Sequence, residues 1–405
     1  MTGAGYVARM RAASGDGLHE QSRTDLQRVH FPARRSFHTD LKRRVEDYFE
    51  GSTRSRHGGW AMGAKSAIML GWLATSYALL MFAHVRPWEA ALLSISVGLA
   101  MAGVGFSVMH DANHGGTSSS ARTNGMMSFT LDLMGASSFL WRSKHNVLHH
   151  TYTNIATLDP DLEGAGAFLR LAPWQSRRGH HRFQHLYVWL LYGVFPLKWW
   201  FVDDLKELVT GRIGGRQFPP ARGRALFVAI AGKALFVTWA FVLPAVLHPS
   251  WALLLFWGLA IFTLGNVLAS VFQLAHCVGE AEFQGSGAIE RDWAEHQVAT
   301  TVDFAPANAL LGWYLGGLNF QVEHHLFPRV CHVHYPALAR IVEATCLAHR
   351  VRYRCEPTLR TALAANWRWL RRMGSPARLT RRPFHLISLS ALASSSGRSA
   401  PRPRP

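Results

Sequence analysis

The chain has 405 residues, of which 49% are hydrophobic and only 17% charged, whereas about one quarter of a soluble chain is charged. Its formal net charge of +18 suits either nucleic acid or anionic lipid, and the long uncharged apolar blocks described below argue against nucleic acid. The four cysteines show no CxxC spacing, so neither a disulfide framework nor a zinc knuckle is expected.

The chain begins with a polar segment, residues 1–30, which we predict to be disordered. Residues 37–50, FHTDLKRRVEDYFE, then place apolar side chains at helical spacing and predict an amphipathic cytosolic helix. We assign residues 31–374 to one membrane domain. The basic low-complexity tail, residues 375–405, is again predicted to be disordered.

Four apolar blocks follow in two pairs, at about 66–83, 91–109, 225–247 and 251–275. A helix needs roughly 20 apolar residues to cross the hydrocarbon core. The only charged side chain in the four blocks is Lys233. We therefore predict an all-α membrane protein with four transmembrane helices arranged as two hairpins. Four buried helices of a soluble protein are the competing interpretation.

The distribution of basic residues predicts the orientation of these helices. The turns within the two pairs, residues 84–88 and 248–250, together hold one arginine, whereas thirteen Lys or Arg lie between residues 110 and 224. The positive-inside rule then places both termini and the central segment in the cytoplasm. Two shorter apolar segments, residues 126–141 and 185–202, contain charged residues and are predicted to be interfacial helices.

Histidines are concentrated in three clusters and one further position. The motif HDANH holds His110 and His114, HNVLHH holds His145, His149 and His150, QVEHH holds His324 and His325 after Gln321, and His276 ends the fourth block. Histidines four residues apart share one face of a helix. Since the predicted orientation puts all of them on the cytoplasmic side, we predict a metal site there.

The type of metal site follows from what the motifs contain. Imidazole binds zinc, copper, nickel and iron alike. A single zinc ion uses three or four protein ligands, so eight histidines suggest two metals. HDANH lacks the glutamate of HExxH hydrolases, and no glutamate is followed three residues later by histidine, as in soluble di-iron bundles. A di-iron cap held by neutral imidazoles is the interpretation that remains.

In sequence and order, HDANH, HNVLHH and QVEHH resemble the three histidine boxes of the membrane fatty acid desaturases, over about residues 28–350. The glutamine that opens the third box is similar to that of the front-end branch and its bacterial relatives. The resemblance implies two iron ions that use O2 and two electrons to remove two hydrogens from adjacent methylenes of an acyl chain. The metal ligands that it implies are His110, His114, His145, His149, His150, His276, His324 and His325.

Other polar residues are expected to support these ligands. Gln321 stands where other branches have a histidine, so it is either a weak ligand or a partner of the ligands. Asp111 is expected to accept a hydrogen bond from a ligand imidazole or to cap a loop. Asn266 and Gln273 are polar groups in the last span and are expected either to serve the site or to pack between helices.

The partners follow from the resemblance as well. The sequence has no cytochrome b5 domain with an HPGG motif, so electrons are expected from a separate donor, such as ferredoxin with its reductase or cytochrome b5. The substrate is a fatty acyl chain, on coenzyme A or on a lipid. Residues 126–141 and 185–202 are either walls of an acyl channel or membrane anchors. The expected location is a bacterial cell membrane, with the active site on the cytoplasmic side.

Two other activities remain open from the residues alone. A fatty acyl or lipid hydroxylase could use the same scaffold and the same oxidising centre, because histidine boxes do not decide the outcome of the reaction. A membrane zinc-dependent lipid amide hydrolase is the more distant alternative, and it would hold zinc and work without O2.

Overall fold

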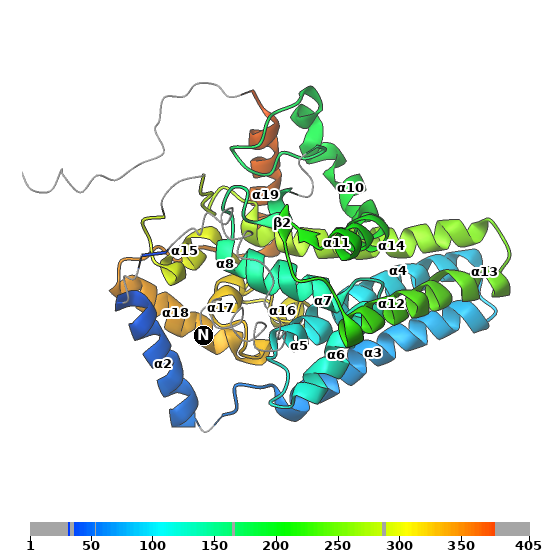
Figure 1. Cartoon of the computed structure of the whole chain (residues 1–405), viewed down its shortest axis with the longest axis horizontal. Helices are drawn as coiled ribbons and strands as arrows, with labels where there is room; N and C mark the ends of the chain where they lie inside the picture. The colour runs from blue at the N-terminus through cyan, green and yellow to red at the C-terminus, as the bar shows by residue number, and fades with distance from the viewer. Residues whose placement is uncertain (1–30, 33–35, 53, 164–166, 286–288, 377–405) are drawn as a thin grey trace, which may run out of the picture.

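The structure, a computed structural model, describes residues 31–32, 36–52, 54–163, 167–285 and 289–376. Within these residues the long apolar helices lie together at one end of the molecule, and shorter elements form a cap at the other end (Figure 1). The predicted disordered segment 1–30 and nearly all of the predicted tail 375–405 lie outside the described residues.

Four helices are long and apolar enough to cross a membrane, which confirms the four predicted spans. They are α3 (Gly59–Phe82), a composite helix over Pro87–His114, a composite helix over Gly223–Leu247, and α14 (Ala252–His276). The second span consists of α4 (Pro87–Val104), η2 (Gly105–Met109) and α5 (His110–His114). The third consists of α12 (Gly223–Val237), η6 (Thr238–Val242) and α13 (Leu243–Leu247).

The spans pack through close backbone contacts. Helix α4 packs against both α3 and α14, and α14 also packs against α10 (Gln184–Lys198). A side chain at Gly98 in α4 would collide with the carbonyl oxygen of Ala260 in α14, so glycine is needed for this close approach. Helix α12 packs chiefly against α6 (Ala121–Leu133). The third and fourth spans are thus joined by a short turn but have different packing neighbours.

The lone charged residue of the predicted spans, Lys233, points into the protein. Its ammonium donates to the carbonyl oxygen of Trp200 at 2.7 Å and to that of Gly135, and it lies 3.4 Å from a carboxylate oxygen of Asp204. Burial raises the pKa of Asp204 to about 6, although Lys233 opposes this shift. A charge inside an apolar helix therefore has a compensating partner, as such positions require.

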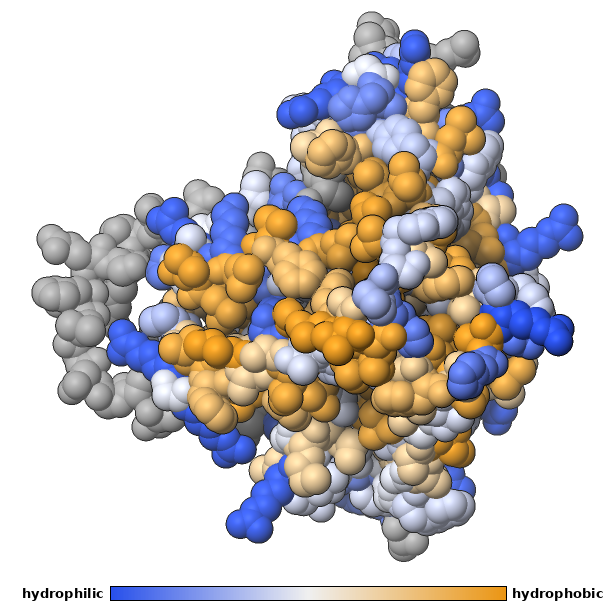
Figure 2. Space-filling view, turned by 90° about the vertical axis from the view of Figure 1, so that its right-hand side faces the viewer, coloured by the Kyte–Doolittle hydropathy of each residue, from blue (hydrophilic) through white to orange (hydrophobic). Residues whose placement is uncertain are grey.

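Apolar side chains cover much of the outer surface of the spans. Figure 2 looks along the long helices from the end where the turns lie, and hydrophobic side chains dominate the middle of that face. Over the spans as a whole, exposed hydrophobic side chains include Leu79 and Phe82 of α3, Phe227 and Ile230 of α12, and Leu254 of α14. Such an extended apolar surface fits lipid rather than water.

The two predicted interfacial segments form helices. Residues 126–141 fall in α6 and α7 (Ser138–Trp141), and residues 185–202 fall in α10 and η5 (Trp199–Asp203). Helix α10 lies along α14 and leaves Leu186, Leu190 and Val194 exposed. Helix α10 lies on the side shown at the top of Figure 1. Helices α6 and α7 pack against α12.

The cap has its own hydrophobic core. Its first helix, α2 (Ser36–Ser52), buries Phe37, Leu41, Val45 and Phe49, which confirms the amphipathic helix predicted over residues 37–50. This face packs against α18 (Tyr335–Ala348) and α15 (Trp293–Thr300). The core of the cap thereby fixes the short helix α17 (Gln321–Leu326), which carries the third histidine cluster.

The remaining elements are short connections, except for one longer helix. They are η3 (Arg142–His149), α8 (His150–Tyr152), α9 (Pro160–Glu163), η4 (Gly179–Phe183), α11 (Asp204–Thr210), α16 (Ala309–Tyr314), η7 (His332–His334) and α19 (Leu359–Gly374). Strand β1 (Arg212–Ile213) pairs antiparallel with β2 (Arg216–Gln217), and β3 (Asp303–Phe304) pairs parallel with β4 (Cys355–Glu356).

Candidate metal centre

The three histidine clusters and His276 meet where the spans join the cap. His110 and His114 lie one turn apart in α5, the last turn of the second span, and their ring centroids are 4.9 Å apart. Gly115 ends this helix at a φ of 78°, a conformation that favours glycine. The second cluster lies on η3 and α8, the third lies on α17, and His276 is the last residue of α14.

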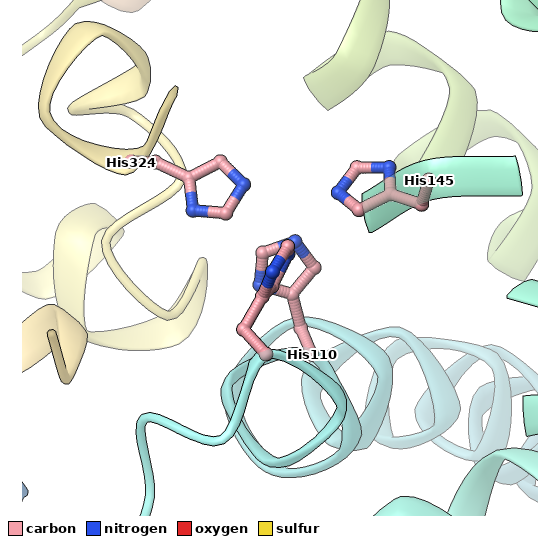
Figure 3. A group of neighbouring side chains, drawn as sticks. His110, His145 and His324 are labelled. Atoms are coloured by element: carbon pink, nitrogen blue, oxygen red, sulfur yellow. The ribbon is translucent and has the colours of Figure 1, made fainter. Parts of the chain in front are cut away.

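One group of four ring nitrogens forms a first candidate site. It comprises His110, His114, His145 and His324, all buried, with ligand nitrogens within 4.8 Å of one another. The rings of His110, His145 and His324 point toward one another from three different elements (Figure 3). Two nitrogens that bind one metal at about 2.1 Å lie up to about 4.2 Å apart. The 4.8 Å limit of the group lies slightly above this value, so a small inward shift of the rings would let them bind one metal ion.

A second group lies beside the first. His149, His276 and His325 bring their ligand nitrogens within 4.8 Å of one another, and His150 forms a similar group with His324 and His325. The Nε2 atoms of His150 and His145 are 3.2 Å apart. His150 therefore lies between the two groups, so the eight predicted histidines form two adjoining candidate sites.

Unpartnered ring nitrogens indicate that these groups are built for a metal. Buried polar atoms are nearly always hydrogen-bonded. Within the two groups, buried nitrogens without a hydrogen-bond partner among the described residues occur on His110, His114, His149, His150 and His324. Outside the groups they also occur on His181, His185 and His334. A divalent metal would satisfy such lone pairs, so the residues present fit an iron pair.

The histidines are held in the form that binds metals. Burial, and then repulsion from neighbouring imidazoles, keeps the pKa of His145, His150, His324 and His325 well below the usual range. These side chains are therefore neutral at pH 7. The neutral imidazole has the free lone pair that a metal ligand needs.

His149 is an exception because a carboxylate faces it. Its Nδ1 lies 3.1 Å from Oδ1 of the buried Asp159, and 3.4 Å from Oδ2 of Asp161. Burial lowers the pKa of His149, but the two carboxylates outweigh burial and raise it to about 9. An Nδ1–H that donates to Asp159 leaves Nε2 toward the metal position, a common arrangement at metal sites. Asp159 also accepts from the backbone N–H of Asp161, two residues further on.

Other histidines of the two groups have neutral partners that were not predicted from the sequence. Nδ1 of His325 lies 2.9 Å from Oε1 of Gln297, and Nδ1 of His324 lies 3.2 Å from the hydroxyl of Tyr335. Nδ1 of His276 lies 3.3 Å from the carbonyl oxygen of Thr300. Each contact orients one ring so that its other nitrogen faces the site. These partners follow no local motif, so no sequence signal identified them.

Gln321 lies among the histidines of the second group. Its side-chain amide lies 3.1 Å from Nε2 of His276 and 3.5 Å from Nε2 of His325, and its Oε1 has no partner among the described residues. Because the oxygen and nitrogen of an amide are assigned from the surrounding hydrogen bonds, either atom can face this position. Both predicted roles, weak ligand and partner of ligands, remain predictions.

The other three supporting residues differ in their surroundings. Asp111 accepts from both the backbone N–H and Nδ1 of His332, at 3.0 and 2.7 Å, whereas it lies 3.8 Å from Nδ1 of His110. Nε2 of His332 in turn lies 2.8 Å from the buried ammonium of Lys65. Asn266 donates to the carbonyl of Phe262 in its own helix.

Gln273 is the last of the residues predicted to support the histidines. Its side-chain oxygen is buried without a partner among the described residues. The roles predicted for Asp111, Asn266 and Gln273 at the site remain predictions. Lys65 lies within α3 and just before the predicted block at 66–83, so the sequence analysis missed it.

Known proteins resemble this chain over most of its length. Residues 86–357 match the family described as fatty acid desaturase. The chain is 38% identical over 353 residues to the sn-1 linoleoyl-lipid 6-desaturase of Synechocystis sp., and the aligned residues cover 86% of this chain and 98% of that protein. It is 37% identical over 340 residues to the protein of the same name from Arthrospira platensis, covering 83% and 92%. The acyl-lipid (8-3)-desaturase of Physcomitrium patens is 38% identical over 343 residues, covering 84% and 72%.

Proposed function

Because the chain belongs to the membrane fatty acid desaturase family and is of the front-end type, we propose that its eight clustered histidines hold two iron ions for acyl desaturation. The chain is an oxidoreductase that desaturates fatty acyl groups. The proposal adds the ligand set, the number of metal ions and the source of the electrons. The observation that carries it is the pair of adjoining imidazole groups with unpartnered, buried nitrogens.

The side chains around the metal position have separate tasks in this proposal. When bound, the iron pair with O2 and two electrons supplies the oxidation that removes two hydrogens from adjacent methylenes. Asp159 holds the proton on Nδ1 of His149, and Gln297 accepts from Nδ1 of His325. These contacts keep both Nε2 atoms directed at the metal position. Burial of all eight rings excludes water and side reactions.

The acyl chain is proposed to pass the first imidazole group along an aromatic wall. Trp141 stacks on His145 with ring centroids 4.3 Å apart, and it faces His110 and His114 at 5.5 Å each. Trp141 ends the predicted segment 126–141, so this contact supports the channel interpretation of that segment. A large aromatic ring beside the metal position would orient methylenes through apolar contact.

The partners of the reaction are proposed on chemical grounds. The desaturation of one bond needs two electrons from outside the chain, and we propose a separate donor such as ferredoxin with its reductase or cytochrome b5. We propose an acyl group on a membrane lipid as the substrate, because the relatives from Synechocystis and Physcomitrium are named as lipid-linked and acyl-lipid desaturases. The proposed location is a bacterial cell membrane, with the cap and its metal centre on the cytoplasmic side.

Metal analysis of the purified full chain tests the ligand set. We expect two iron ions per chain, and His149→Ala should lose one of them while the helical content stays unchanged. His84→Ala is the matched control, because His84 lies on the exposed turn between the first two spans. Equal iron in both variants would contradict the assignment of His149. One zinc ion in place of iron would contradict the proposed centre as a whole.

A further inference from the structure

We propose that a small cavity beside the metal centre binds the uncharged, polyhydroxyl headgroup of the lipid that carries the acyl chain. The cavity lies between the start of α3 and the segment that leads from α5 into α6, and its volume is about 280 Å³. Its hydroxyl-bearing wall consists of Ser55, Ser66, Thr117, Ser118, Ser119 and Thr123. This inference rests on the proposed function, because it identifies where that reaction holds the polar end of its substrate.

The chemistry of the lining selects the ligand. Six hydroxyl side chains and the imidazole of His57 line the cavity, and the described residues contribute no Lys, Arg, Asp or Glu to it. A hydroxyl group both donates and accepts, so a wall of hydroxyls matches the hydroxyls of a sugar or glycerol. A phosphate or a coenzyme A would instead be expected to meet arginine or lysine.

Two of these hydroxyls lack partners inside the protein. Ser66 is 3% exposed and Thr117 is 7% exposed, and neither hydroxyl oxygen has a hydrogen-bond partner among the described residues. A buried polar group without a partner costs about 1–3 kcal/mol. Ligand hydroxyls could remove that cost after a small rotation of either side chain. The cavity therefore has unmet hydrogen-bonding capacity next to its hydroxyl wall.

The size of the cavity limits what it holds. Sites for small molecules usually enclose about 300–1,000 Å³. A cavity of about 280 Å³ lies just below that range, so it suits one headgroup rather than a whole lipid. The acyl chains must then lie outside it, along the apolar surfaces of the spans.

The position of the cavity fits a front-end desaturase. Thr117 follows the proposed ligand His114 by three residues, so their Cα atoms are at most roughly 11 Å apart. The Nδ1 atom of His57 lies 3.1 Å from the carbonyl oxygen of Gly116, which fixes this segment to the start of α3. A front-end enzyme oxidises the acyl chain toward its carboxyl end. The polar end of its substrate must therefore lie close to the metals.

Exposed apolar side chains lie next to residues that line the cavity. Trp60, in the first turn of α3, is 86% exposed, and Met126, next to the lining residue Met127, is 70% exposed. Tryptophan is enriched where a membrane meets water. The cavity thus lies at the level where the headgroup of a membrane lipid would be, with apolar side chains toward the bilayer.

A glycine in the cavity wall offers a direct test. A Cβ atom added at Gly63 in α3 would meet no atom within 4 Å, and Gly63 lines the cavity, so we expect Gly63→Leu to occupy part of the cavity without disturbing the backbone. Gly71 lies two turns further along the same helix, is equally unobstructed and does not line the cavity. Gly71→Leu is therefore the matched control, since both changes remove a helical glycine.

The first measurement is binding rather than activity. The metal-free full chain in nanodiscs of phosphatidylcholine is titrated with a monoglycosyl diacylglycerol that carries linoleoyl chains. We expect Gly63→Leu to weaken binding at least tenfold and Gly71→Leu to leave it unchanged. Equal binding by the two variants would overturn the headgroup site. Tighter binding of phosphatidylglycerol than of the glycolipid by the wild type would overturn the uncharged ligand class.

The second measurement separates this site from the proposed function. The iron-loaded variants are assayed for desaturation of the same glycolipid, and iron per chain is measured in parallel. We expect Gly63→Leu to keep its iron and to raise KM at least tenfold. Loss of iron or of all turnover in the wild type would contradict the proposed function, whereas the binding measurement would still decide on the headgroup site. Unchanged KM in Gly63→Leu with normal iron would contradict the headgroup site alone.

Discussion

Replacement of Asp159 by asparagine should weaken the metal site that contains His149. Asp159 is buried, and its carboxylate accepts from Nδ1 of His149 at 3.1 Å and from the backbone N–H of Asn154 at 2.9 Å. Asparagine keeps the volume and one oxygen, but it loses the charge and directs an NH2 group at one of these donors. The perturbation thus removes the support of one ligand without opening a cavity.

The expected loss can be estimated from these contacts. A hydrogen bond to a charged group contributes about 1.5–3 kcal/mol, which corresponds to roughly 10- to 150-fold in a binding constant. Loss of a group that orients a metal ligand typically costs about 10- to 100-fold in metal affinity. The two estimates agree, so we expect the Asp159→Asn chain to bind the more weakly held iron about 10- to 100-fold less tightly.

The pH of the measurement matters for this comparison. In the metal-free protein, burial lowers the pKa of His149, but Asp159 and Asp161 raise it to about 9. Below pH 9 the metal must therefore displace a proton from the wild-type His149, which weakens binding by up to tenfold per pH unit. The variant lacks most of this competition. The difference in iron affinity between the wild type and Asp159→Asn should therefore be largest at pH 9 and smaller at pH 7.

Chelator competition under anaerobic conditions measures the affinity for iron(II) at both pH values. The matched control is Asp161→Asn, because the Asp161 side chain is 40% exposed and lies 3.4 Å from His149. Exposed ion pairs contribute about 0.2–1 kcal/mol, so we expect less than about a fivefold loss. The reasoning is refuted if Asp159→Asn binds iron as the wild type does at pH 9. It is also refuted if Asp161→Asn loses as much affinity.

Two further predictions concern buried charges outside the metal ligands. Burial and the neighbouring Asp303 raise the pKa of Glu323 well above its usual range, so stability should fall by up to about 1.4 kcal/mol per pH unit as the pH rises above about 4.3. In Glu323→Gln the melting temperature should depend less on pH between pH 5 and 8 than in the wild type. Parallel curves of melting temperature against pH for the two proteins would contradict this. Lys233→Met leaves Asp204 buried without its cation and should cost up to about 3–5 kcal/mol. The double variant Lys233→Met with Asp204→Asn should regain stability, measured as the melting temperature in detergent. A double variant no more stable than Lys233→Met would argue against the pairing of Lys233 with Asp204.

Much of the fold could be predicted because it depends on composition and periodicity. The four spans are apolar over a length that fits a bilayer, and the helix over residues 37–50 has its apolar face at helical spacing. Such patterns need no knowledge of distant contacts. The sequence did not show that α12 packs on α6 rather than along α14, because several apolar helices offer similar faces.

The histidine motifs likewise determined which residues are candidates. Helical spacing alone placed His110 and His114 on one face, and the structure has them in a single turn. Spacing could not tell that His145 joins the group with His110 and His324, or that His149 joins the group with His276 and His325. The segment that carries both is a π-helix, η3, rather than the α-helix that the spacing suggested. The extra residue per turn changes the direction of each ring.

The residues that contact the clustered histidines were decided by tertiary structure alone. Asp159 reaches His149 from ten residues away, Gln297 reaches His325 from a separate helix, and Lys65 reaches His332 from the first span. The sequence by itself determined a membrane protein with histidines suited to metals, because hydrophobicity and ligand chemistry are properties of single residues and short segments. Only the packing of the cap on the spans decided how those histidines are grouped and oriented, because hydrogen bonds and shared metal ligands depend on distances between segments far apart in the chain.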